Sequence, residues 1–213
     1  TGGEYEDFDG MGIDILFTGS QKAFGVCPGM LVLWAGQKAL ERRKALGMIS
    51  EYYVDFEKWI PVMDDPAKYF ATPAINLVWA MQEATAIIKE EGMQARAERH
   101  RRNADAVAAG LEAGGLTLLA EPGSRASTLS CVLYPPGVDD GAFRAAMLKH
   151  SVVVAGALGP QAGKAFRIGH MGNATESDMV VTLGAIEGSL RDCGVYLELG
   201  KVVGAYMEFM ERA

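Results

Sequence analysis

One lysine lies in a turn whose neighbours fit it for covalent chemistry. The segment Asp14-Ile-Leu-Phe-Thr-Gly-Ser-Gln-Lys-Ala-Phe-Gly25 is a short apolar run followed by a small polar turn, and it places Lys22 just beyond the end of an expected strand. An amine is nucleophilic only when it is unprotonated, and active sites favour that form by desolvation or by nearby positive charge. Lys22 is therefore suited to forming a Schiff base with an aldehyde cofactor. The alternative is a solvated loop lysine without a chemical role.

Arginine and histidine side chains follow in a strand-like run, Lys164-Ala-Phe-Arg-Ile-Gly-His-Met-Gly172. A guanidinium in an apolar strand is costly to bury unless acceptors satisfy its N–H groups, and its planar fork suits a carboxylate. Arg167 is therefore a candidate either for binding a substrate carboxylate or for a structural ion pair. His170, three residues further on, is a candidate acid–base group because an unperturbed histidine titrates near neutrality.

A third segment, Tyr69-Phe-Ala-Thr-Pro-Ala-Ile-Asn76, combines hydroxyl side chains with an expected helix start. Thr72 followed by Pro73 predicts a helix that the threonine caps and the proline begins. The free N–H groups and the dipole of a helix amino terminus favour an anion such as a phosphate. Tyr69 and Thr72 are thus candidate phosphate ligands, unless Thr72 only caps the helix and Tyr69 packs against it.

Apolar periodicity and turn residues predict the elements that position these side chains. In the first part of the chain we expect buried strands at 13–17 and 30–34, helices at 36–48 and 72–91, and an irregular connection at 55–71. In the second part we expect helices at 93–113 and 139–149, strands at 116–119, 128–133, 152–154 and 165–168, a capping box at 175–178 before another helix, and a last helix beyond 194. Such short alternating elements are typical of a compact α+β domain.

Composition and charge exclude several classes of partner. The formal net charge of −7 disfavours binding to nucleic acid, and the basic cluster at 96–102 is expected to be a solvated helix face. Cys27, Cys131 and Cys193 fit neither a disulfide framework nor zinc-ligand spacing, so we expect a reducing, cytoplasmic compartment and no metal. No apolar run approaches the ~20 residues of a membrane span, so no membrane partner is expected.

The Thr-Gly-Ser-Gln-Lys-Ala segment around Lys22 resembles the cofactor-lysine motif of class V pyridoxal-phosphate aminotransferases, particularly the alanine–glyoxylate and serine–pyruvate group. The resemblance runs through most of the chain, which looks like the carboxy-terminal portion of such an enzyme. It implies the α/β fold of the fold-type I transferases. Residues 1–92 would complete the large mixed-sheet domain, 93–195 would form a small α+β domain, and 196–213 a carboxy-terminal helical tail.

The resemblance also implies a role for each candidate residue. Lys22 would form the Schiff base (aldimine) with pyridoxal 5'-phosphate, and Gln21 would contact the cofactor phosphate. Tyr69 and Thr72 would reach across a homodimer interface to the phosphate bound by the partner. Arg167 would bind the α-carboxylate of the substrate, which leaves His170 a structural role.

The function that follows is ping-pong transamination between a small amino acid, alanine or serine, and a 2-oxo acid, glyoxylate or pyruvate. Aminoethylphosphonate and ureidoglycine variants of the family stay open, as do a class V lyase or cysteine desulfurase and a non-catalytic dimerisation module. Desulfurases usually have histidine before the lysine, so Gln21 favours transamination. In the family, the acidic partner of the pyridine nitrogen, the ring-stacking residue and a glycine-rich phosphate turn precede the lysine. We therefore expect this chain to need an upstream remainder of the large domain before it holds cofactor.

Overall fold

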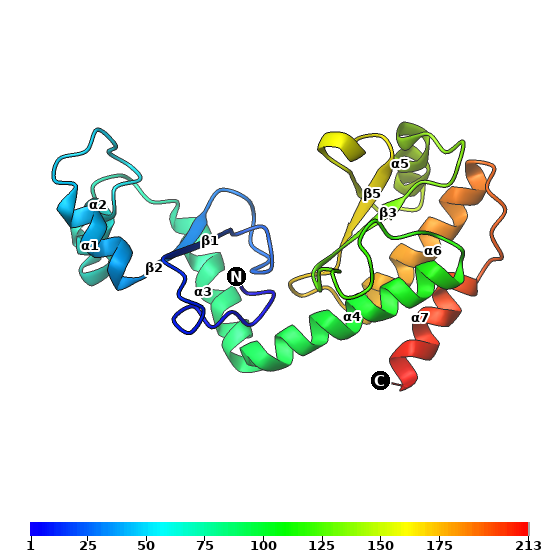
Figure 1. Ribbon diagram of the computed structural model, residues 1–213, viewed down its shortest axis with the longest axis horizontal. Coiled ribbons are helices and arrows are strands. Elements are labelled where there is room, and N and C mark those ends of the chain that lie inside the picture. Colours follow the sequence, from blue (N-terminus) through cyan, green and yellow to red (C-terminus); the bar gives the residue numbers. More distant parts are fainter. Residues whose placement is uncertain (213) are drawn as a thin grey trace. The chain divides into compact units, whose positions relative to one another are not determined.

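The computed structural model describes residues 1–212, which form two compact units, Thr1–Gly92 and the residues from Met93 onward (Figure 1). Each unit has its own helices and its own antiparallel sheet. The division falls at Gly92, whose φ of +83° ends the last helix of the first unit. A positive φ is strained for residues that carry a Cβ atom, so glycine suits this helix end.

The sheet of the first unit is a two-stranded antiparallel ribbon on either side of the lysine turn. β1 (Ile15–Gly19) pairs with β2 (Leu31–Ala35), and Phe17 lies opposite Leu33. The prediction of two strands flanking the turn is confirmed, but the prediction that both are buried is wrong. Phe17 is 64% exposed and Leu33 39%, so among residues 1–212 these positions of the two-stranded sheet are not covered by a packed layer.

Helical segments follow β2: α1 (Gln37–Ala45), α2 (Phe56–Asp64) and the 3-10 helix η1 (Pro66–Lys68). The prediction of an irregular connection at 55–71 is therefore wrong at its centre. Asp55 caps α2 by accepting a hydrogen bond from the backbone N–H of Glu57, and its buried carboxylate pairs with Arg43 on α1 at 2.6 Å. Pro66 is compatible with a helical segment because it stands at the start of η1, where a missing N–H leaves no bond unmade.

Helix α3 (Ile75–Glu91) ends where the sequence predicts but begins later. Ala74 occupies the cap position and provides no side-chain hydrogen bond, so the prediction that Thr72 caps this helix is wrong. The backbone N–H of Ile75 donates to the carbonyl of Pro73 at 3.0 Å. The chain thus makes a tight turn at the proline before the helix starts.

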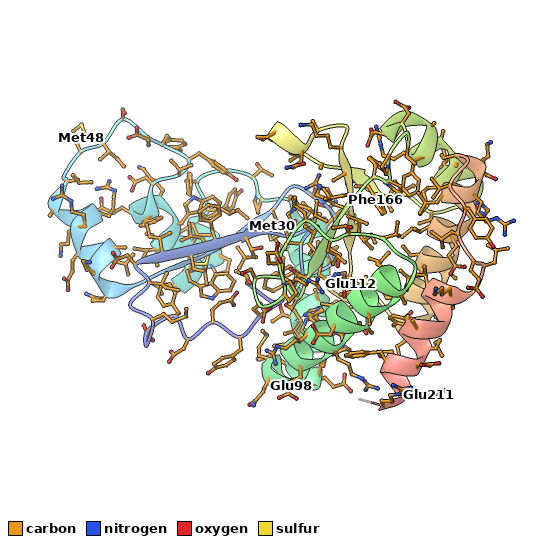
Figure 2. The ribbon with its side chains drawn as sticks, turned by 45° about the vertical axis from the view of Figure 1, so that its right-hand side comes forward. Met30, Met48, Glu98, Glu112, Phe166 and Glu211 are labelled. Atoms are coloured by element: carbon orange, nitrogen blue, oxygen red, sulfur yellow. The ribbon has the colours of Figure 1, made fainter. Side chains whose placement is uncertain are left out.

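The second unit contains α4 (Met93–Ala113), β3 (Leu129–Leu133), α5 (Asp140–Lys149), β4 (Ala155–Gly156), the 3-10 helix η2 (Gly159–Gln161), β5 (Ala165–Gly169), α6 (Glu176–Asp192) and α7 (Lys201–Arg212). β5 lies between β3 and β4 and is antiparallel to both. One core joins this sheet to its helices, and it includes the fully buried Phe143, Phe166 (labelled in Figure 2), Leu183 and Tyr206. The arrangement is α+β, as predicted.

Two of the predicted strands in the second unit are not formed as expected. Residues 116–119 contribute only an isolated bridge between Leu118 and Val132, and β4 begins just after residues 152–154. In β3, Ser130 and Val132 are the buried residues. The Ser130 hydroxyl has a partner in this core, since it lies 3.0 Å from Nε2 of the buried His170. A partnered hydroxyl can occupy a core that an unpartnered one would destabilise.

The basic cluster on α4 is a solvated face only in part: Arg101 and Arg102 are exposed, as predicted for residues 96–102, but the other basic residues are not. Arg96 and His100 are fully buried. Arg96 donates to the side-chain oxygen of Asn173 at 3.3 Å, and Arg99 donates to the carbonyl of Gly172 at 3.0 Å. Both arginines donate to acceptors in the loop between β5 and α6. The helical pattern of the sequence alone does not reveal these contacts.

The last helix docks on its own unit, with α7 lying along α4 (Figure 1). Glu187 on α6 is 3% exposed, and its carboxylate accepts hydrogen bonds from the backbone N–H groups of Gly200 and Val202, both at 2.7 Å. A carboxylate at this place satisfies N–H groups at the amino terminus of α7 and complements the helix dipole.

Substituting Glu187→Gln should lower the free energy of unfolding of the second unit by about 1–3 kcal/mol, because it replaces a charged acceptor with an amide beside buried donors. Denaturant unfolding followed by circular dichroism measures the change. Glu208→Gln is the matched control, since Glu208 forms only an exposed pair with Arg212 on the same helix. Removing that pair should change stability by less than about 0.5 kcal/mol. Equal effects of the two substitutions would rule out the capping role of Glu187.

Candidate active site

The backbone of the lysine turn is held by consecutive hydrogen bonds. The N–H of Lys22 donates to the carbonyl of Gly19 at 3.0 Å, and the N–H of Gly25 donates to the carbonyl of Lys22 at 2.9 Å. Gly25 has a φ of +70°, which favours glycine at this point of the turn. The Lys22 side chain is exposed. The turn therefore presents this amine on a fixed backbone.

Ser20 connects the lysine turn to the residues just before β2 through hydrogen bonds. Its side chain is fully buried, and its hydroxyl donates to the carbonyl of Cys27 at 2.7 Å and accepts from the N–H of Met30 at 3.3 Å. The Ser20 N–H also donates to the carbonyl of Met30 (labelled in Figure 2) at 2.9 Å. No sequence signal distinguishes this serine from the other small polar residues of the turn, so its role is visible only in the structure.

Gln21 folds back over the end of β1. A Cβ atom added to Gly19 would lie 2.5 Å from Oε1 of Gln21, so a larger residue at position 19 would displace the Gln21 amide. The amide is exposed, and it has no hydrogen-bond partner among residues 1–212. Its two N–H donors are available to an anion next to Lys22, which fits the phosphate of an aldehyde cofactor bound to that lysine.

Tyr69 and Thr72 lie in an exposed segment next to an aromatic cluster. Phe70 packs against Trp59 with ring centroids 4.9 Å apart and against Tyr52 at 5.4 Å, which anchors the segment. Tyr69 is 59% exposed, and Thr72 is exposed and caps no helix. Thr72 therefore does not have the capping role that was its structural alternative. Among the described residues, no hydrogen bond joins either side chain to the lysine turn.

Arg167 is the central residue of β5, between Cys131 on β3 and Ala155 on β4. It is half-buried, and its Nε donates to the carbonyl of Gly156 at 2.9 Å. Within residues 1–212, its two terminal nitrogens have no hydrogen-bond or ion-pair partner. Among these residues no acidic side chain forms the structural ion pair that was one alternative, and the planar fork has the geometry to accept a carboxylate.

Two titratable neighbours of Arg167 are poor candidates for acid–base chemistry. Burial lowers the pKa of His170 to about 4, and nearby His100 acts in the same direction, so His170 is neutral at neutral pH. With its Nε2 beside the Ser130 hydroxyl, His170 has the structural role expected of it. Burial raises the pKa of the Cys131 thiol, although the charge of Arg167 opposes this.

Lys22 and Gln21 lie in the first unit with Tyr69 and Thr72, whereas Arg167 lies in the second. Among the described residues, no group of three or more His, Cys, Asp or Glu side chains could hold a metal ion, and the three cysteines are free thiols. None of the described helices has the length and apolar character of a membrane span.

The fold and the lysine turn define a fold-type I transferase, and comparison with known proteins gives the family. The model of the aminotransferase class-V family matches residues 2–163, so the chain belongs to this family, and the predicted resemblance is confirmed. An uncharacterized aminotransferase of Methanocaldococcus jannaschii is 37% identical over 194 residues, covering 91% of this chain and 50% of that protein. A serine–glyoxylate aminotransferase of Hyphomicrobium methylovorum is 34% identical over 204 residues, covering 94% of this chain and 50% of its own length.

Solved structures agree with this assignment. The crystal structure of a ureidoglycine–glyoxylate aminotransferase from Bacillus subtilis superposes with a TM-score of 0.93 at 29% sequence identity, covering 99% of this chain and 55% of that one. The predicted fold class is therefore confirmed. The chain spans about half the length of the curated relatives that it matches.

Proposed function

We propose that the protein to which this chain belongs catalyses pyridoxal-phosphate-dependent transamination between a small amino acid and a 2-oxo acid. The observation that carries this proposal is the Lys22 turn: an exposed amine on a hydrogen-bonded backbone, with the unpartnered amide of Gln21 beside it. The open fork of Arg167 supports it, because amino acids and oxo acids both carry a carboxylate. The names of the relatives from Hyphomicrobium methylovorum and Bacillus subtilis share glyoxylate and differ in the donor.

Lys22, Gln21 and Arg167 each have a separate proposed role in this reaction. When bound, pyridoxal phosphate would supply an electron sink for the chemistry at the α-carbon of the substrate. Lys22 would hold the cofactor through its amine, and the same amine would move the α-proton of the substrate. Gln21 would donate its amide N–H groups to the cofactor phosphate. Arg167 orients the substrate carboxylate in both half-reactions, which supplies proximity to the reacting carbon.

The proposed assembly is a homodimer in which Tyr69 and Thr72 bind the cofactor phosphate of the partner. Both side chains are exposed in the single chain, which is compatible with a role at an interface. Apolar side chains of the first unit are exposed as well, with Phe17 at 64% and Trp79 on α3 at 68%. Such surface is usually covered in an assembled protein. We propose that the remainder of the large domain covers part of this apolar surface. The proposed compartment is the cytoplasm.

A panel of amino donors tests the proposed reaction. In the full-length protein loaded with pyridoxal phosphate, we expect L-alanine or L-serine to convert the cofactor absorbance to that of pyridoxamine phosphate. Addition of glyoxylate or pyruvate should then restore the original band. Omitting the oxo acid is the control, since the band should then stay shifted. Release of alanine from cysteine without any oxo acid would instead indicate a lyase or desulfurase, and absence of the cofactor band would indicate a non-catalytic module.

A further inference from the structure

The short strand β4 determines how the Arg167 side chain is held. β4 comprises only Ala155 and Gly156, and it lies at the edge of the sheet beside β5. The Gly156 carbonyl is the acceptor for Nε of Arg167 at 2.9 Å. A single bond to Nε limits rotation of the guanidinium plane and leaves both terminal nitrogens to face a ligand. Whatever fixes Gly156 therefore also orients the fork.

Asp140, the first residue of α5, is held by two side chains that lie on different elements. Its Oδ1 accepts a hydrogen bond from the Tyr134 hydroxyl at 2.9 Å, and its Oδ2 accepts from Nε and Nη2 of Arg144 at 3.0 and 2.6 Å. The hydrogen bonds from Arg144 lower the pKa of Asp140, so the carboxylate is charged at neutral pH. Burial and the bond to Asp140 raise the pKa of Tyr134 well above its usual range, so its hydroxyl remains a donor.

Tyr134 connects the Asp140 carboxylate to the hydrophobic core of the second unit. Its ring lies 5.3 Å from the ring of Phe143 on α5 and 5.3 Å from that of Phe166 on β5. Phe166 precedes Arg167 in the strand and is the cross-strand partner of Gly156. The carboxylate of Asp140 is thus fixed relative to the sheet by packed aromatic rings as well as by hydrogen bonds.

Gly156 is the residue of β4 that lies near the side chains of Asp140 and Arg144. A Cβ atom added to Gly156 would lie 3.3 Å from Oδ1 of Asp140 and 3.8 Å from Nε of Arg144. The first distance is shorter than ordinary van der Waals contact, so an alanine at this position would displace the carboxylate by a few tenths of an ångström.

We propose that Asp140, fastened by Tyr134 and Arg144, is a positioning residue for Arg167. It fixes Gly156, and the Gly156 carbonyl orients the guanidinium toward the substrate carboxylate. This inference rests on the proposed carboxylate-binding role of Arg167. Two parallel hydrogen bonds to a carboxylate require the fork in a narrow range of orientations, so a shift of β4 weakens substrate binding even though Asp140 does not touch substrate.

Steady-state kinetics of the full-length, cofactor-loaded enzyme test the positioning role of Asp140. Asp140→Asn breaks the charged pair with Arg144, and Gly156→Ala pushes on the carboxylate while keeping Asp140. We expect each to raise KM for both the amino acid and the oxo acid about five- to twentyfold, with kcat changed less than about twofold. The rate with ethylamine, which lacks a carboxylate, should not change. In an Arg167→Ala background, neither substitution should raise KM further.

Asp139→Ala is the matched control. Asp139 caps the same helix by accepting from the N–H of Ala142 at 2.9 Å, so its loss should lower the melting temperature and leave KM unchanged. If Arg167→Ala raises KM but Asp140→Asn and Gly156→Ala do not, the positioning role is refuted and the proposed function stands. Equal losses with ethylamine and with alanine also refute it, because they reflect general destabilisation. If Arg167→Ala itself leaves KM unchanged, both the role of Arg167 and this inference fail.

Discussion

Substituting Lys22→Ala should lower kcat for transamination at least about a thousandfold, because positioned acid–base catalysis alone contributes about 10²–10⁴-fold. Alanine at this position can neither bind the cofactor covalently nor transfer the α-proton. The other proposed phosphate contacts remain, so the variant should still bind pyridoxal phosphate noncovalently. Steady-state rates with alanine and glyoxylate, together with equilibrium dialysis of the cofactor, measure both effects. Partial recovery of activity with added methylamine would show that the missing group is an amine.

Lys38→Ala is the matched control for this substitution. Lys38 belongs to the same unit, and its exposed amine pairs with Asp14 at 3.1 Å on the surface. Its removal should leave turnover unchanged within about twofold, because exposed pairs contribute little. If Lys22→Ala retained a tenth or more of the activity, the lysine would not be the catalytic amine.

Arg167→Ala should chiefly raise KM, for the amino acid and the oxo acid alike. One hydrogen bond to a charged group is worth about 1.5–3 kcal/mol, so losing the fork should raise KM by at least roughly 10- to 150-fold. Arg167→Lys should be intermediate, because an ammonium keeps the charge but not the planar fork. Initial rates with each substrate varied in turn give the two KM values.

Arg191 provides the control for the lost positive charge, since it is an exposed arginine near the end of α6 in the same unit. Arg191→Ala should leave both KM values unchanged. If Arg167→Ala behaved in the same way, the carboxylate site would have to be assigned to other residues.

Local signals in the sequence predict much of the second unit. The capping box is present, with Thr175 accepting from the N–H of Asp178 and the Asp178 carboxylate accepting from the N–H of Thr175. Helix α4 has its predicted bounds, and Met179, Leu183 and others at helical spacing in α6 are buried. Caps and periodicity depend on residues a few positions apart, which is why they can be predicted without the tertiary structure.

Burial and longer-range contacts cannot be predicted in the same way. Phe17 has the pattern of a buried strand residue but is 64% exposed, because burial depends on what packs on the face of the sheet and not on the local pattern. Arg96 looks like part of a solvated face until the loop that accepts its hydrogen bond is in place. The chemistry proposed for Lys22 and Arg167 is a prediction from residue type and motif. The support that Asp140 gives to Gly156 cannot be predicted in this way, since it depends on contacts between α5 and the edge of a sheet.

The covalent attachment of the cofactor is the most direct test of the central claim. The full-length protein would be loaded with pyridoxal phosphate, reduced with borohydride, digested and analysed by tandem mass spectrometry. We expect the reduced phosphopyridoxyl group on the peptide that contains Gly19, Ser20 and Gln21, with the added mass on Lys22 and on no other lysine. Attachment at a different lysine, or a cofactor that can be washed away after reduction, would contradict the assignment of Lys22 as the catalytic residue.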